Sequence, residues 1–283
     1  MEMEYSNVHA YVICLAVFFF FRTSHCSQKK GIALSPKLFL CDDFQALNNV
    51  SWWYDWQMNF YHYHHFTNCT DIDSHKYNHI PMVWGHNSRH TIAVPSDTWA
   101  ILGFNEPNFH SQSNLTAAQA VTFWRDIEKH SHGKPLVSPA AAPCSTHSKC
   151  YGNSFDWFDD FFKLCQGCRI DYLATHAYHC HGNTTMAYLR DLNHRYGKKI
   201  WLTEFACPNS HDIHKQLRYM QELLPQLEAA DFVYRYSWYK ARIVTSGHIT
   251  TAASLLHSHS SSLTTLGRFY NSFQGNNQPS IVG

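Results

Sequence analysis

Residues 99–141 indicate the fold most clearly, and they read WAILGFNEPNFHSQSNLTAAQAVTFWRDIEKHSHGKPLVSPAA. The stretch begins with the short apolar run Trp99–Glu106 and ends with a second such run, Pro135–Ala141, and both are typical of buried strands. Between them, Ala117–His130 has apolar residues three and four positions apart, as an amphipathic helix does. Because a helix separates the two strands, they are predicted to be parallel and joined by a crossover connection.

The same unit of strand and helix recurs along the rest of the chain. Eight short apolar runs are predicted to be strands: Gly31–Ser35, Val50–Trp56, His79–Gly85, Trp99–Glu106, Pro135–Ala141, Tyr172–Tyr178, Lys199–Ala206 and Val233–Tyr239. The segments predicted to be helices are Ala117–His130, Asp156–Leu164, Thr185–Tyr196, Asp212–Ala230 and, closing the ring, Thr251–Phe273. Eight strands favour a single α/β domain folded as a (β/α)8 TIM barrel. The alternative is an open doubly wound sheet, which is weakened because no G-x-G-x-x-G motif follows the first strand.

Composition excludes several classes of protein. The chain has 283 residues, which suits one barrel, and 45% of them are hydrophobic, which argues against disorder. The formal net charge is only +1 and there is no basic run, so nucleic acid is not an expected partner. Aromatic residues make up 16% of the chain, more than a core alone needs, and they suggest a flat, uncharged ligand.

The N-terminus contains an apolar run of eleven residues, Tyr11–Phe21. A membrane span takes roughly 20 residues, so this run is too short for one but suits the core of a signal peptide. We therefore expect residues 1–26 to be a signal peptide, cleaved somewhere in Thr23–Ser27, and residues 27–283 to form a secreted, monomeric domain without a membrane span. The run is preceded by acidic rather than basic residues, so an uncleaved anchor or a buried segment is the alternative.

Cysteines and glycosylation motifs agree with export. Two of the ten cysteines lie in or near the expected signal peptide, and the eight that remain indicate disulfides in a secreted chain. Cys180 and Cys207 are expected to pair because they project from neighbouring strand ends. The other expected pairs, one across a short turn and two by elimination, are Cys165–Cys168, Cys144–Cys150 and Cys41–Cys69. Candidate glycosylation sites with the N-x-S/T motif are Asn49, Asn68, Asn114 and Asn183.

Two glutamates follow directly after predicted strands. Glu106 comes at the end of the fourth strand and Glu204 near the end of the seventh, and in a barrel of this kind catalytic groups lie at these carboxyl ends. A helix-capping role for Glu106, with Pro107 in the first turn, is the alternative for that residue alone. A pair of carboxyl groups across one cleft is the machinery of glycoside hydrolysis. We expect Glu106 to be the acid and base, Glu204 to be the nucleophile, and Asn105 to donate a hydrogen bond to a sugar 2-hydroxyl.

Aromatic side chains are the second feature of the strand ends. Sugar rings pack their apolar C–H faces on such side chains, so they are candidate substrate-binding groups. These candidates are Trp52, Tyr54, Trp56, Trp84, His176, Tyr178 and Trp238. Alternation along the second strand puts Trp52, Tyr54 and Trp56 on one face and Trp53 and Asp55 on the other, and the sequence leaves open which face is inward.

Six stretches contain the candidate residues: SWWYDW (51–56), IPMVWG (80–85), LGFNEPN (102–108), DYLATHAY (171–178), IWLTEF (200–205) and RYSWY (235–239). Together they resemble glycoside hydrolase family 128, the clan A β-1,3-glucanases. The resemblance runs from about Lys30 to Tyr270.

The resemblance implies endo-acting hydrolysis of β-1,3-glucan with retention of configuration, without a metal or organic cofactor. His176 and Tyr178 match the family's pair on the sixth strand, and Trp238 its aromatic residue on the eighth. Asp55 stands where asparagine is expected, which puts one substrate hydrogen bond in doubt. The loop Lys240–Thr251 has no match that we can assign, so exo action stays open.

Other interpretations remain at this point. The 22 histidines include the clusters Tyr61–His65 and His179–His181, but a zinc site needs three or four convergent ligands, and we expect exposed loop histidines and no metal. A hydrolase of β-1,4- or β-1,6-glucan is the first rival function. The second is a non-catalytic protein that recognises β-glucan through the aromatic cleft.

Overall fold

The computed structural model describes residues 27–60, 69, 72–75, 78–86, 92–144 and 148–275. The expected signal peptide, the cluster Tyr61–His65 and the candidate glycosylation site Asn68 lie outside these residues. No described helix is long and apolar enough to cross a membrane.

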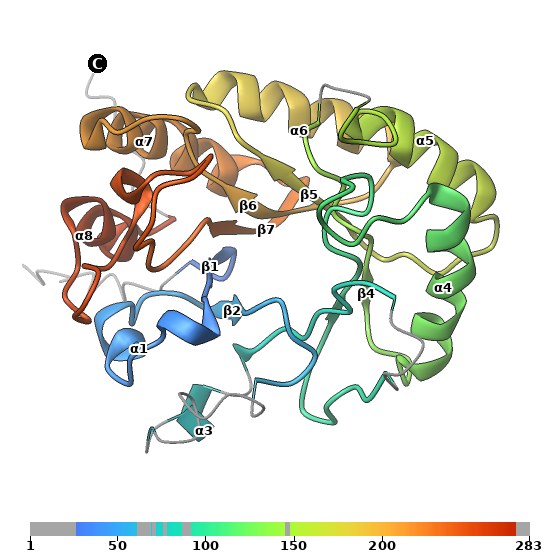
Figure 1. The fold of residues 1–283 in the computed structure, drawn as a ribbon, viewed down its shortest axis with the longest axis horizontal. Helices are drawn as coiled ribbons and strands as arrows, with labels where there is room; N and C mark the ends of the chain where they lie inside the picture. The colour runs from blue at the N-terminus through green and yellow to red at the C-terminus, as the bar shows by residue number, and fades with distance from the viewer. Residues whose placement is uncertain are drawn as a thin grey trace, which may run out of the picture.

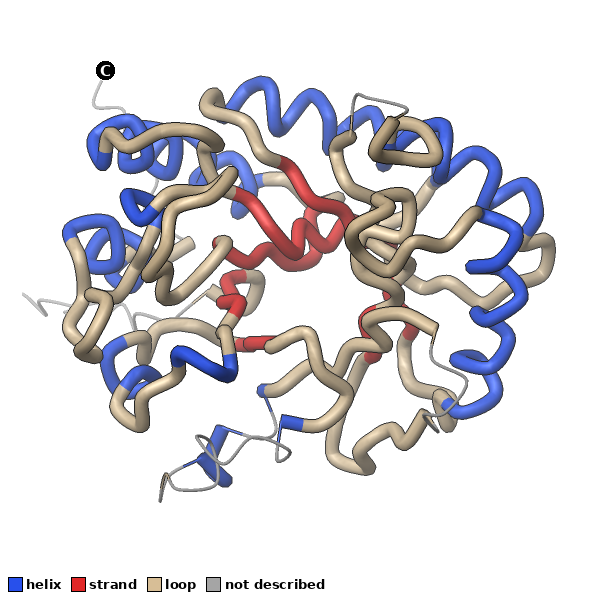
Figure 2. Tube along the Cα trace, in the orientation of Figure 1, coloured by secondary structure: helices blue, strands red, loops and turns tan. Residues whose placement is uncertain are grey.

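Parallel strands gather at the centre of the molecule, and helices cover their outer side (Figures 1 and 2). The strands are β1 (Lys30–Ala33), β2 (Trp52–Tyr54), β3 (Ile101–Leu102), β4 (Leu136–Val137), β5 (Leu173–Ala177), β6 (Ile200–Phe205) and β7 (Val233–Trp238). Five of them form a sheet in the order β2-β1-β7-β6-β5, and β3 pairs with β4.

Single parallel bridges connect these two sheets on both sides. On one side the segment around residues 79–82 lies between β2 and β3, through the bridges Trp53–His79 and Met82–Leu102. On the other side Val137 of β4 bridges to Tyr172, immediately before β5. All eight predicted runs therefore follow one another around the ring, and the predicted (β/α)8 barrel is confirmed.

The main helices lie between the strands, as the sequence predicts. They are α4 (Ala117–His130), α5 (Ser154–Leu164), α6 (Gly182–Tyr196), α7 (Ile213–Ala229) and α8 (Thr265–Ser272). Shorter elements are α1 (Asp43–Ala46), α3 (Ile72–His75) and the 3-10 turns η1 (Pro36–Leu38) and η4 (Thr251–Ala253). Local chemistry sets their limits: Thr116 and Gln119 form a capping box at the start of α4, and Gly197 ends α6 with a φ of 64°.

The prediction of one helix over Thr251–Phe273 is wrong. Only a 3-10 turn and α8 are helical there, and Leu256 and Leu263 form an antiparallel bridge between them. Serine hydroxyls compete with the helical hydrogen bonds in this stretch, because Ser254 Oγ accepts from Ile243 N and donates to Leu256 O. The helix begins only after Thr264, whose hydroxyl accepts from Gly267 N.

Two layers of buried side chains hold the barrel together. The larger layer lies between strands and helices and includes Trp53, and the smaller one fills the barrel interior and includes Trp52, Tyr54 and Trp201. This settles the alternation along β2, because Trp52 and Tyr54 point inward. The carboxyl ends of the strands then present their next residues to one common face.

The first strand and the last helix are joined by a buried lysine. Lys30 in β1 is fully buried, and its ammonium donates to the carbonyl oxygens of Tyr270, at 2.8 Å, and Asn271, at 3.3 Å, at the end of α8. These carbonyls have no partner within the helix, so the lysine satisfies them.

The structure contains the four expected disulfides. They are Cys41–Cys69, Cys144–Cys150, Cys165–Cys168 and Cys180–Cys207. The last of these joins the loops that leave β5 and β6, with 4.4 Å between the two Cα atoms. It therefore lies beside the strand ends from which His176 and Glu204 project.

Candidate active site

Glu106 and Glu204 lie at the same end of the barrel. Backbone pairing continues past the short strand β3, because Asn105 N donates to Trp84 O and Glu106 N donates to Ala140 O, both at 2.9 Å. Glu204 belongs to β6 itself. No helix begins at Pro107, so the alternative helix-capping role of Glu106 is wrong.

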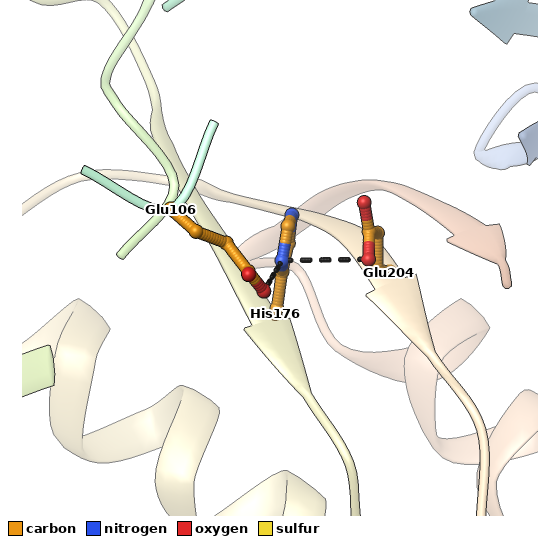
Figure 3. Close-up of side chains that lie close together, drawn as sticks. All are labelled: Glu106, His176 and Glu204. Atoms are coloured by element: carbon orange, nitrogen blue, oxygen red, sulfur yellow. Dashed lines mark hydrogen bonds and ion pairs between the residues drawn. The ribbon is translucent and has the colours of Figure 1, made fainter. Parts of the chain in front are cut away.

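His176, from β5, lies between the two glutamates (Figure 3). Its Nδ1 is 2.7 Å from Glu106 Oε1 and 3.5 Å from Glu204 Oε2. The nearest ligand atoms of all three residues lie within 4.8 Å of one another, which brings the two carboxyl groups across one small gap. All three side chains are buried, and His176 Nε2 has no hydrogen-bond partner among the described residues.

Glu204 is surrounded by hydrogen-bond donors from aromatic side chains. Trp56 Nε1 donates to Oε1 at 2.9 Å, Tyr54 Oη donates to the same oxygen at 3.3 Å, and Tyr178 Oη donates to Oε2. Among the residues that the structure describes, the Glu106 carboxyl has one hydrogen-bond partner, His176. The two carboxyl groups therefore differ in environment, which is the usual basis for giving them different roles.

Burial and charge shift the titration of this group. Burial raises the pKa of Glu204; the charge of Glu106 adds to this, while His176 and the hydrogen bonds from Tyr178 and Trp56 oppose it. Burial alone would lower the pKa of His176, but the charge of Glu204 and the hydrogen bond and charge of Glu106 outweigh it, so this pKa is raised. His176 therefore holds its proton more firmly between the two carboxyl groups than a free imidazole does.

Two residues of the site have a left-handed backbone. Trp56 has a φ of 61° and Glu106 a φ of 43°, in a region that non-glycine residues seldom occupy. Such conformations cost on the order of 1–3 kcal/mol and are found where function requires them. Here they direct one side chain to Glu204 and place the other beside His176.

The remaining predicted binding residues are placed at different depths. Asn105 is buried next to Glu106, and its Nδ2 donates to Gln112 Oε1 at 3.2 Å. Asn105 Oδ1 has no partner among the described residues, so this oxygen is an acceptor available to a hydroxyl. Trp84 is 40% exposed at the rim, where its backbone oxygen pairs with Asn105. Tyr178 is partly exposed in the cleft.

Two of the predicted substrate-binding residues belong to the core instead. Trp52 is fully buried in the barrel interior, one layer below Tyr54, and its Nε1 donates to Lys29 O at 3.0 Å. Trp238 is fully buried between β7 and the outer helices, and its Nε1 donates to Ala253 O at 2.8 Å. Both rings are fully enclosed, that of Trp52 by the interior layer and that of Trp238 by the outer layer of the core.

Tyr239 ends the predicted strand Val233–Tyr239 and the matching stretch 235–239, whereas sequence reasoning missed Lys240 and His248. Tyr239 and Lys240 follow β7, and the Tyr239 ring meets Trp56 edge-on at 5.9 Å. His248, further along the same loop, meets Tyr178 edge-on at 5.6 Å. The position of Lys240 just beyond a strand end was the signal that could have found it, whereas His248 is brought in by a loop whose path no local pattern describes.

The departure at position 55 has a structural counterpart. Asp55 is buried, and its Oδ1 is 2.9 Å from Nε2 of the buried His79. Asp55 Oδ1 also accepts from Gln57 N at 3.2 Å, and so it fixes the backbone around Trp56. The carboxylate therefore acts away from the cleft, in holding the end of β2.

A metal ion is the other ligand to consider for the cluster. Among the described residues, Glu106, His176 and Glu204 are the group of carboxylates and histidines spaced closely enough to hold one. Zinc needs three or four such ligands, so this set is the minimum. The donors around Glu204, which already occupy both of its oxygens, favour a carboxylate that works without a metal.

The described glycosylation candidates differ in exposure. Asn114 and Asn183 are exposed and Asn49 is partly buried. Asn183 lies in the first turn of α6, where its Oδ1 accepts from Gln226 Nε2 at 3.2 Å. A glycan on Asn183 would stand near the loop that leaves β5.

Comparison with known proteins gives a consistent result. The family model described as glycosyl hydrolase catalytic core matches residues 37–270. A protein named alkali-sensitive linkage protein 1, from Schizosaccharomyces pombe, is 24% identical over 259 residues. That match covers 87% of this chain but only 45% of the relative, so the chain spans about half the length of that protein.

Solved structures are similar over nearly their whole length. A family 128 (subgroup II) endo-β-1,3-glucanase from Sorangium cellulosum is 30% identical with a TM-score of 0.74, covering 87% of this chain and 99% of that one. A second enzyme of the same description, from Pseudomonas viridiflava, is 31% identical with a TM-score of 0.70, covering 87% and 98%.

Proposed function

This chain belongs to the glycosyl hydrolase catalytic core family and to glycoside hydrolase family 128, and we propose that it hydrolyses β-1,3-glucan with retention of configuration. The observation that carries the proposal is the pair Glu106 and Glu204, which face each other across His176 within 4.8 Å. Retaining glycosidases place their carboxyl groups about 5–5.5 Å apart, whereas inverting enzymes need a wider gap of about 6.5–9.5 Å for a water molecule.

The surroundings of the two carboxyl groups support their separate roles. Glu204 accepts hydrogen bonds from Trp56, Tyr54 and Tyr178, and hydrogen bonds to a carboxylate favour its charged, nucleophilic form. Among the described residues, the Glu106 carboxyl has one side-chain partner, His176, against three donors on Glu204. We assign Glu204 as the nucleophile and Glu106 as the acid and base.

The reaction then proceeds in two displacements. Glu204 attacks the anomeric carbon while Glu106 gives its proton to the glycosidic oxygen, so that bond breaks and a covalent glucosyl–enzyme forms. A water molecule next gives a proton to Glu106 and attacks the same carbon, which releases Glu204. The buried imidazole of His176 holds Glu106 in place and offsets negative charge in both steps.

The substrate is proposed from the similar enzymes and from the walls of the cleft. Both of the most similar structures described above are endo-β-1,3-glucanases at 30% and 31% identity, which supports endo action on the same linkage. Trp84, Trp56 and Tyr178 provide aromatic surface around the carboxyl pair for sugar rings.

Product analysis on laminarin tests this function. The enzyme should release soluble oligosaccharides from laminarin faster than from β-1,4- or β-1,6-glucan, and the first product detected by NMR should have the β configuration. Initial α products would refute the retaining mechanism. Equal rates on all three glucans would refute the linkage assignment.

Export is the last part of the proposal. Four disulfides are typical of a chain that folds in an oxidising compartment, and the signal-like run at the N-terminus agrees with this. Expression of the full chain in a eukaryotic host should place the active protein in the medium. Activity confined to the cell extract would contradict it.

A further inference from the structure

Lys240 comes two residues after the end of β7 and lies beside two aromatic rings, one of which donates a hydrogen bond to Glu204. The Lys240 ammonium lies 5.4 Å from the ring centre of Tyr239 and 5.9 Å from that of Trp56. These two rings meet edge-on, and Trp56 donates directly to Glu204. Lys240 is therefore part of the lining next to the proposed nucleophile, on a loop that the sequence left unassigned.

The ammonium has three donors and no acceptor in the described protein. Lys240 makes no hydrogen bond or ion pair among the described residues, although its side chain is only partly exposed. Burial lowers the pKa of Lys240, and the charge of Glu204 opposes that shift. The three N–H donors of this ammonium are therefore available to a bound ligand, and burying them without an acceptor would cost free energy.

The backbone on the C-terminal side of Lys240 is held firmly. Ala241 N donates to Ala33 O at 3.0 Å, at the end of β1. Arg242 forms a buried ion pair with Asp43, with 2.5 Å between NH2 and Oδ1, and its Nε donates to Leu38 O at 2.9 Å. The backbone that follows Lys240 is thus fixed to the first part of the barrel.

We propose that Lys240 is a substrate-binding residue, whose ammonium donates hydrogen bonds to hydroxyl oxygens of the glucosyl unit that lies against Trp56 and Tyr239. The inference rests on the proposed function and adds a specific contact to it. An ammonium suits this task because a hydroxyl oxygen can accept from it while the sugar ring packs on the adjacent aromatic faces. The competing explanation is that Lys240 only supports Trp56 through its cation–π contact.

Substitution by methionine and by arginine tests the contact with the sugar, and the thermal unfolding midpoint reports whether the change also disturbs the packing of Trp56. Lys240→Met keeps the length and the apolar stem and removes the donors, and Lys240→Arg keeps positive charge and donors. Lys163→Met, on the exposed side of α5, is the matched control. Binding of laminarihexaose is measured by calorimetry in the Glu204→Gln background, and kcat and KM on laminarin are measured in the active enzyme.

We expect Lys240→Met to raise the Kd for laminarihexaose about tenfold to a hundredfold, with the larger part of the loss in KM and with an unchanged thermal unfolding midpoint. Lys240→Arg should recover part of the affinity, and Lys163→Met should bind like its parent. Unchanged binding by Lys240→Met, or a loss that follows a lower unfolding midpoint, overturns the inference.

The failure of the broader function would look different. If the wild-type chain fails to hydrolyse laminarin and Glu204→Gln fails to bind laminarihexaose, the substrate assignment fails and this inference fails with it. If the wild type is active while Lys240→Met binds and turns over normally, only the role of Lys240 is refuted.

Discussion

The hydroxyl of Tyr178 offers a single-atom test of how Glu204 is activated. Tyr178→Phe removes the donor to Glu204 Oε2 and leaves the ring, which packs edge-on against Tyr239 at 5.9 Å and His248 at 5.6 Å. Burial and the charges of Glu204 and Glu106 raise the pKa of Tyr178 well above its ordinary value, so the hydroxyl remains a donor at neutral pH.

The size of the effect follows from the contacts that remain. A hydrogen bond to a charged group contributes about 1.5–3 kcal/mol, and each 1.36 kcal/mol is a factor of ten in rate, so kcat should fall about 10- to 150-fold. Activity should not vanish, because Trp56 and Tyr54 still donate to the other oxygen of Glu204. The acid limb of the pH–rate profile should move to higher pH, since this hydrogen bond lowers the pKa of Glu204.

The assay is the initial rate of reducing-end release from laminarin, measured across pH. Tyr196→Phe is the control, because its hydroxyl donates to Asp159 at 2.9 Å outside the site. The reasoning about Glu204 is wrong if Tyr178→Phe, like the Tyr196→Phe control, keeps the wild-type kcat and the wild-type acid limb.

Three further outcomes are expected. Because the pKa of Glu204 is raised, activity of the wild type should fall with decreasing pH at values above the ordinary pKa of a glutamic acid, and an acid limb at the ordinary value would contradict this. Glu204→Gln should unfold at a higher temperature than the wild type at neutral pH because the buried charge is gone, and a lower unfolding temperature would contradict this. Trp238→Ala should cost about 3–5 kcal/mol in the free energy of unfolding by urea, whereas Trp84→Ala should leave stability nearly unchanged and raise KM for laminarin; the reverse pattern would mean that the two tryptophans have been assigned to the wrong places. Incubation with EDTA followed by gel filtration should leave activity on laminarin unchanged, and its loss with recovery on adding zinc would assign Glu106, His176 and Glu204 to a metal.

The barrel could be predicted because its information is local and repeated. Each apolar run is long enough to identify, and α4 begins and ends where the spacing places it. The helix predicted over Thr251–Phe273 failed because serine hydroxyls there bond to the backbone, and a periodicity of apolar residues does not report that competition. The two glutamates were found for the same reason as the strands, since each lies at or near the carboxyl end of a predicted strand.

Depth within the barrel could not be predicted. Alternation assigned Trp52, Tyr54 and Trp56 to one face, but only the last two reach Glu204, because each residue along a strand moves to a different layer. Trp238 shows the same limit: it lies at the carboxyl end of β7, but its ring is buried in the outer layer of the core, where its Nε1 donates to Ala253 O. The pairing of Asp55 with His79 depends on the register between β2 and the neighbouring segment around residue 79, and this register cannot be read from the spacing of residues in the sequence.

The buried ammonium of Lys30 has a consequence for how the molecule is made. Its acceptors lie 240 and 241 positions further along the chain, so this contact can form only after α8 has been synthesised. It joins residues of very large sequence separation, and closure of the seam between the first strand and the last helix is therefore a late, long-range event of folding.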